Sequence, residues 1–73
     1  MDYNTAQQVF AEVNRKLGYQ TSMTGYRQDG EHEYRVNVLY ETLDMDRLEE
    51  LMGVAGDRNV DIEVSKQYGV TFR

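Results

Sequence analysis

An Asp-Gly pair at residues 29–30 constrains the fold more than any other feature of this sequence. It stands between two segments in which apolar and polar residues alternate, residues 19–28 and 31–40. A two-residue type I′ turn needs a positive φ angle at both central positions, and Asp-Gly is among the pairs that best tolerate this requirement. The sequence therefore predicts a β-hairpin in which Gln28 lies opposite Glu31.

The register of this hairpin follows from its turn and agrees with its hydrophobic pattern. Because side chains alternate between the two faces of a strand, a slip of one residue would move every apolar side chain to the opposite face. Counting outward from the turn places three pairs on one face: Met23 with Val36, Thr21 with Val38, and Tyr19 with Tyr40. Turn chemistry and hydrophobic pattern thus predict the same register.

Residues 4–17 have the spacing of an amphipathic helix. Their apolar side chains recur three or four positions apart, which turns one face of the helix towards a core. Asn4 or Thr5 is expected to cap the first turn, and Gly18 is expected to supply the left-handed exit. The apolar positions are Ala6, Val9, Phe10, Val13 and Leu17.

Residues 45–55 have the same helical spacing, with apolar side chains that include Met45 and Met52. Asp44 is the expected N-cap, and a hydrophobic staple between Leu43 and Leu48 would fix the entry of the chain. Gly56 is expected to end this helix.

Residues 60–72 alternate again and fit either one long strand or a second hairpin. A three-residue loop at residues 66–68 would pair Val64 with Val70 and Ile62 with Phe72, which keeps all four side chains on one face. The hairpin is the favoured interpretation, and a single strand would leave a sheet of three strands.

The whole chain, residues 1–73, is predicted to form a single small α+β domain, because it contains no linker and no proline. The order helix, hairpin, helix, hairpin (αββαββ) favours two helices on one face of a four-stranded sheet. One interpretation is a circularly permuted ferredoxin-like order, in which the last strand lies centrally and parallel to residues 31–40. The chain has no cysteine, so its small core must rely on packing or oligomerisation.

A net charge of −5 limits the partners that the chain can have. Phosphate backbones and anionic membranes are both negatively charged and attract proteins through Lys and Arg. We therefore expect no direct binding to nucleic acid or membrane. No apolar run is long enough to span a bilayer, and the N-terminal residues do not have the pattern of a signal peptide. The expected location is the cytoplasm.

No constellation in the sequence predicts catalysis, a metal site or a cofactor. Residues 44–50, DMDRLEE, begin like a calcium loop, but Leu48 replaces the third ligand and Ala55 replaces the acid at the twelfth position. There is no cysteine nucleophile, and neither Ser22 nor Ser65 has a predictable base beside it. Acid–base catalysis needs two carboxylates in different environments, and the spacing buries none of them. We therefore expect a protein that is not an enzyme.

Two surface features remain as candidates for binding a partner. The first is an acidic stripe on the outer face of the second helix, formed by Asp46, Glu49, Glu50 and Asp57. The stretch that contains it, residues 41–58, holds six acids and only two arginines. Such a stripe is also typical of a solvated helix face. The second is the sheet face turned away from the helices. The residues predicted to bind a partner are Glu41, Asp46, Glu49, Glu50 and Asp57 on or beside the helix, and Tyr26, Glu33 and Leu39 on the sheet.

These features favour a non-enzymatic protein-interaction module that presents carboxylates to a basic protein surface. Small acidic inhibitors, including phage proteins that mimic nucleic acid and occupy basic channels of nucleic-acid-binding proteins, are similar in size and sign of charge. The alternative is a homodimeric structural or small-ligand-binding domain. Tyr26 and Leu39 on the open sheet face would then be buried between two copies of the chain.

Overall fold

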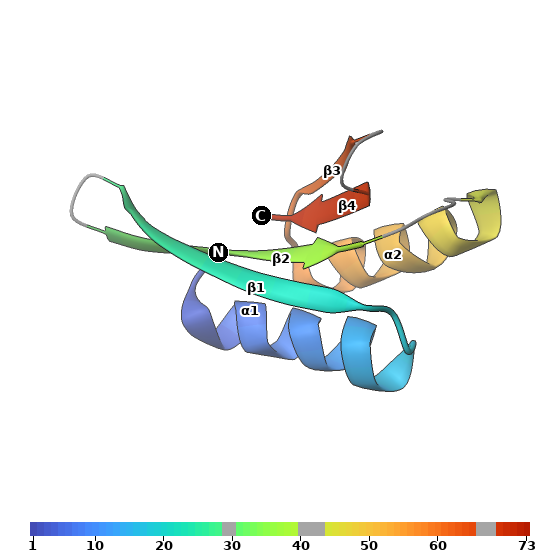
Figure 1. The fold of residues 1–73 in the computed structure, drawn as a ribbon, viewed down its shortest axis with the longest axis horizontal. Coiled ribbons are helices and arrows are strands. Elements are labelled where there is room, and N and C mark those ends of the chain that lie inside the picture. Colours follow the sequence, from blue (N-terminus) through green and yellow to red (C-terminus); the bar gives the residue numbers. More distant parts are fainter. Residues whose placement is uncertain (29–30, 40–43, 66–68) are drawn as a thin grey trace.

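The computed structural model describes residues 1–28, 31–39, 44–65 and 69–73, without the side chains of residues 26, 28 and 31 (Figure 1). Its elements follow the order helix, hairpin, helix, hairpin, which confirms the predicted α+β class. They are α1 (Tyr3–Phe10), the π-helical segment η1 (Ala11–Lys16), β1 (Thr21–Gln28), β2 (Glu31–Val38), α2 (Met45–Arg58), β3 (Ile62–Ser65) and β4 (Gly69–Phe72).

The four strands form one sheet in the order β1-β2-β4-β3, and all neighbours are antiparallel. The last strand lies centrally as predicted, but the expectation that it runs parallel to β2 is wrong. The strand that runs parallel to β2 is β3. The second hairpin then reverses the direction of the chain, so β4 runs antiparallel to both β2 and β3. The three-stranded alternative is also wrong, since residues 62–72 form two strands. The circularly permuted ferredoxin-like order stays an interpretation.

Both hairpins have the predicted register. Thr21 lies opposite Val38, Met23 opposite Val36 and Gln28 opposite Glu31. In the second hairpin Val64 lies opposite Val70 and Ile62 opposite Phe72. The two predicted turns and Tyr40 lie outside the described residues. The assumed loop lengths together with the parity along each strand were therefore enough to predict the pairing, because a slip of one residue would expose the apolar set.

The core lies between the two helices and one face of the sheet, as predicted. Because the helices cover only this face, the other face of the sheet is left without a helical layer (Figure 1). The buried side chains of the core come from three parts of the fold. They are Val36, Val38, Val70 and Phe72 of the central strands, Ala6, Val9 and Val13 of α1 and η1, and Leu51, Val54 and Ala55 of α2.

Several apolar side chains lie elsewhere than the sequence predicted. Val54 belongs to the core, where it is only 4% exposed. Met45 and Met52 fit the helical spacing, yet they are 69% and 53% exposed. Val64 has the parity of the core face but is 51% exposed, because β3 is the edge strand of the sheet.

The first helix starts at Tyr3, one residue before the predicted span of 4–17, and Asn4 and Thr5 do not cap it. Asp2 is the N-cap, and its Oδ1 accepts a hydrogen bond from the Thr5 N–H at 2.8 Å. The hydrogen bonds from Thr5 lower the pKa of the Asp2 carboxyl. From Ala11 the helix widens to π geometry, and Gly18 then adopts the predicted left-handed exit with φ of 79°.

The second helix begins as predicted and ends later. Asp44 is its N-cap, whereas the partner expected at Leu43 lies outside the described residues. Gly56 does not end the helix, which runs to Arg58. Asn59 takes the left-handed conformation instead, with φ of 55°, and the Val60 N–H donates to the Ala55 carbonyl.

Gly53 and Gly18 provide a matched pair for testing the backbone. A Cβ added at either position would meet no atom within 4 Å, so packing does not distinguish them. Gly53 lies inside α2, where Ala is favoured over Gly, so Gly53→Ala should raise the free energy of unfolding by about 1 kcal/mol. Gly18→Ala should lower it by about 1 kcal/mol, because an L side chain is strained at positive φ. Urea unfolding followed by circular dichroism measures both, and a loss of stability in Gly53→Ala would contradict the helix assignment.

Candidate functional site

The acidic stripe lies on the outer face of α2 because the inner face is occupied by the core. Leu51, Val54 and Ala55 are buried against the sheet and α1. At about 100° of rotation per residue, the stripe falls on the opposite side of the helix. The structure places all four of its members, Asp46, Glu49, Glu50 and Asp57, in solvent.

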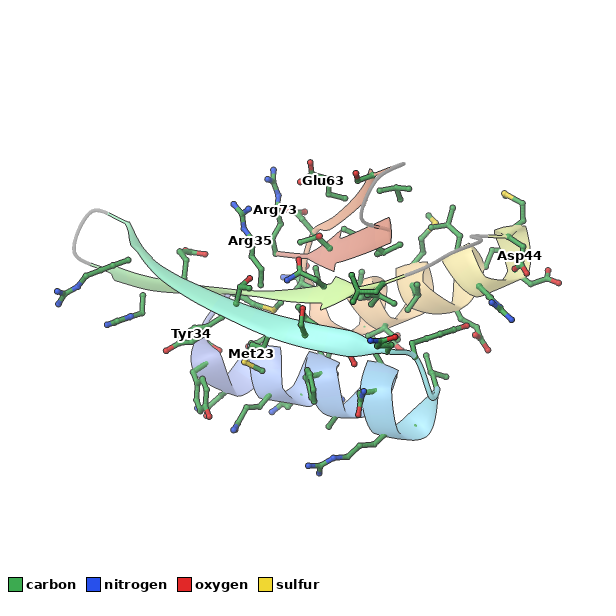
Figure 2. The ribbon with its side chains drawn as sticks, viewed as in Figure 1. Met23, Tyr34, Arg35, Asp44, Glu63 and Arg73 are labelled. Atoms are coloured by element: carbon green, nitrogen blue, oxygen red, sulfur yellow. The ribbon has the colours of Figure 1, made fainter. Side chains whose placement is uncertain are left out.

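The start of α2 is fixed by Asp44. Its Oδ1 accepts a hydrogen bond from the Arg47 N–H at 2.9 Å, which satisfies a backbone donor that the helix itself cannot. Its Oδ2 lies 3.7 Å from Arg47 Nε, in an ion pair whose two side chains are both exposed. Figure 2 shows Asp44 at the outer end of α2, where the helix begins.

Three of the predicted partner-binding acids meet in one shallow hollow of about 620 Å³, which Asp46, Glu49 and Glu50 line together with Tyr19, Asp44 and Arg47. The Tyr19 hydroxyl donates a hydrogen bond of 2.6 Å to Glu50 Oε2. This contact orients the Glu50 carboxylate and joins α2 to the segment that enters β1. We call these six residues the acidic hollow.

Sequence reasoning missed Tyr19 as a member of this hollow. The residue was assigned to a cross-strand pair, and it lies 31 positions from Glu50 in the chain. No local pattern links positions so far apart, so only the packing of α2 beside the start of β1 brings them together.

Most of the stripe carries no compensating charge. Among the described residues, Asp46, Glu49 and Asp57 have no ion-pair or hydrogen-bond partner. The second cation of α2, Arg58, turns towards α1 and η1, where its Nη2 lies 3.1 Å from Glu12 Oε2 and its Nη1 donates to Gln8 Oε1 at 2.9 Å. The stripe therefore presents a field of one sign to solvent.

The remaining predicted residues do not join the hollow. Asp57 lies eleven residues beyond Asp46, about 16 Å along the axis of the helix. Glu41 lies outside the described part of the chain. Glu33 and Leu39 belong to β2 and the segment after it, and Leu39 is 46% exposed. The Glu33 carboxylate accepts a hydrogen bond of 3.0 Å from the Met1 ammonium group.

The open face of the sheet is largely polar. Arg35, Glu63 and Arg73 project from it, on the side away from the helices (Figure 2). Arg73 Nη1 pairs with Glu63 Oε2 at 3.2 Å. Across the strands, Asn37 donates to Thr24 Oγ1 at 3.2 Å and accepts from the Thr71 hydroxyl at 3.0 Å. Tyr26 belongs to β1, but its side chain is not described. The face thus consists mainly of polar groups that already have partners.

The described residues contain neither a cluster of metal ligands nor a membrane-spanning helix. No group of three or more His, Cys, Asp and Glu side chains there is placed to hold a metal ion. In the same part of the chain, no helix is both long and apolar enough to cross a membrane.

Comparison with known proteins identifies no relative of this chain. No family model matches it, and no curated protein or solved structure is significantly similar to it. The acidic stripe and the acidic hollow are therefore the features from which a function can be inferred.

The two acids at the start of α2 should contribute differently to folding. Asp44→Ala removes a capping hydrogen bond and should lower the free energy of unfolding by about 1 kcal/mol. Asp46→Ala is the matched control, because it removes an equal charge in the same turn but no cap, and it should cost about 0.3 kcal/mol. Thermal and urea unfolding of both variants checks this, and equal losses would show that Asp44 acts only through its charge.

Proposed function

We propose that this protein is a non-enzymatic interaction module that binds a basic protein surface through the acidic stripe of α2. The observation that carries the proposal is the row of exposed carboxylates on α2 without partners among the described residues. Carboxylates held on a rigid helix present their charge at fixed spacing. Such a surface steers association with an oppositely charged partner and discriminates against neutral ones.

The acidic hollow supports the same function. Its carboxylates converge from one and a half turns of helix, and the hydrogen bond from Tyr19 holds Glu50 in place. A guanidinium group binds carboxylates through paired hydrogen bonds, so converging acids favour an arginine of the partner. We place the arginine-rich or lysine-rich surface of a nucleic-acid-binding protein first among partners, and the cytoplasm as the compartment where the two meet. Occupation of that surface by this protein would inhibit or regulate nucleic-acid binding.

The alternative function, a homodimer that buries the open sheet face, has less support. The face carries a hydrogen-bonded row of Thr24, Asn37 and Thr71 and the ion pair of Glu63 with Arg73. Burying such polar and charged groups contributes little binding free energy compared with burying apolar groups. Among the described side chains, the apolar contribution to that face comes from Leu39, which is 46% exposed.

Reversal of the stripe tests the proposal. In the double variant Glu49→Lys/Asp57→Lys the fold should remain intact, because exposed charges contribute little to stability. Proteins captured from a cell lysate on the immobilised wild-type chain should be enriched in nucleic-acid-binding proteins. The variant should lose them, with an association rate for a purified captured partner at least ~10-fold lower.

The matched control is Asp61→Lys/Glu63→Lys, which makes the same change in net charge away from α2 and should keep most of the captured proteins. Capture should also weaken when ionic strength rises from about 0.1 M to 1 M, because the Debye length falls from about 10 Å to 3 Å. Equal losses in both double variants, or capture that is indifferent to salt, would contradict binding through the stripe.

A further inference from the structure

Three exposed apolar side chains lie at one margin of the helix layer, and we call them the methionine strip. They are Met45 and Met52 of α2 and Val64 of β3, which are 69%, 53% and 51% exposed. Single exposed apolar residues are ordinary on protein surfaces, but a set that shares one margin is typical of an interaction site.

The positions of the strip on α2 follow from the contacts of that helix. Arg58 faces α1 and η1, where it contacts Gln8 and Glu12. Met45 and Met52 are seven residues apart and so lie on one flank, about 120–140° around the helix from Arg58. Because α1 covers β1 and β2, this flank is turned towards the β3 edge of the sheet.

Val64 reaches the same margin from the sheet. It lies opposite Val70, one row from the pair Ile62 and Phe72, so its side chain is on the face that the helices cover. At the edge strand the helix layer ends, which leaves Val64 uncovered. Leu48 and Ile62 are half-buried and pack against the core. The strip is therefore an outward continuation of the core.

The acidic stripe of α2 borders the methionine strip through Glu49. Glu49 is four residues after Met45 and three before Met52, so it neighbours both on the helix surface. Asp61 and Glu63 have the opposite parity to Val64 on β3 and so project from the open face of the sheet, away from the strip. An occupant that covers the apolar side chains must therefore bring positive charge to the Glu49 side of the strip.

We infer that the methionine strip is the docking site for a basic amphipathic helix of the partner protein, an inference that rests on the proposed function and specifies its partner. The strip follows α2 for two turns, about 10 Å, which matches apolar residues three, four and seven positions apart on a second helix. Unbranched methionine side chains adapt to such a partner. An added strand is a poorer occupant, because β3 offers only four residues of edge.

Methionine methyl groups provide a direct readout. The chain has four methionines, and [13C-methyl]methionine labelling therefore gives four signals, each assigned by a Met→Leu substitution. The probe is a synthetic peptide of Leu and Lys with its leucines on one helical face. We expect it to shift the Met45 and Met52 signals and to leave Met23 unchanged, because Met23 lies beside α1 and faces the core (Figure 2).

A scrambled peptide of the same composition controls for charge alone, and it should bind at least ~10-fold more weakly because it cannot bury the methionines together. Met45→Gln/Met52→Gln should reduce the affinity for the amphipathic peptide to that level, whereas Met45→Leu/Met52→Leu should preserve it. Equal affinity of the two peptides, or no loss in the Gln variant, would overturn the inference.

The outcomes separate this inference from the proposed function. If the strip substitutions have no effect while Glu49→Lys/Asp57→Lys weakens both peptides, the strip is excluded and the acidic stripe still stands. If Met45 and Met52 shift with protein concentration in the absence of peptide, the occupant is a second copy of the chain and the inference fails. If neither peptide binds, the inference fails as well, and the capture experiment alone decides the proposed function.

Discussion

The pairing of β2 with β4 is the interaction on which the rest of the structure depends. It places Val36 opposite Phe72 and Val38 opposite Val70, and all four side chains are at most 1% exposed. These strands come from opposite halves of the chain, so their ladder joins the unit of α1, β1 and β2 to the unit of α2, β3 and β4. Neither hairpin could cover its apolar face alone, because an isolated two-stranded hairpin is marginal in water. The shared row of valines and Phe72 gives both helices one surface to pack on.

The position of the acidic stripe is a consequence of this arrangement. With the sheet covered on one face only, α2 must turn Leu51, Val54 and Ala55 towards the core. The outer face is then free of any packing requirement, and its four acids add little to folding beyond the first-turn position of Asp46 and the hydrogen bond of Glu50 with Tyr19. Exposed charges contribute little to stability. A surface whose charge is mostly unneutralised and of little structural benefit suits the recognition that we propose, and the neighbouring methionines would add the apolar contact that charge alone lacks.

The parts of the fold that could be predicted from the sequence are those set by local chemistry. Asp29-Gly30 and the parity of the flanking residues determined the first register, and a three-residue loop together with parity determined the second. The N-cap of α1 could not be chosen reliably, because Asp2, Asn4 and Thr5 are all good caps and the π segment changes the phase of the helix. Gly56 resembled a helix end, but Asn59 can also adopt positive φ and packing extended the helix to it. In the candidate site, the exposed acids followed from periodicity. The contact of Tyr19 with Glu50 depends on tertiary packing and left no trace in the sequence.

Native-state hydrogen exchange of the backbone amides is the most direct test of the claim that the β2–β4 ladder makes the chain one cooperative unit. Proteins that unfold as one unit exchange their most protected amides with the free energy of global unfolding. The hydrogen-bonded amides of β2 and β4 and those in the middle of α1 and α2 should therefore share one free energy of exchange, equal to that from urea unfolding. If the amides of α2, β3 and β4 exchange with a distinctly lower free energy than those of α1, β1 and β2, the two halves open independently and the central role of the ladder is contradicted.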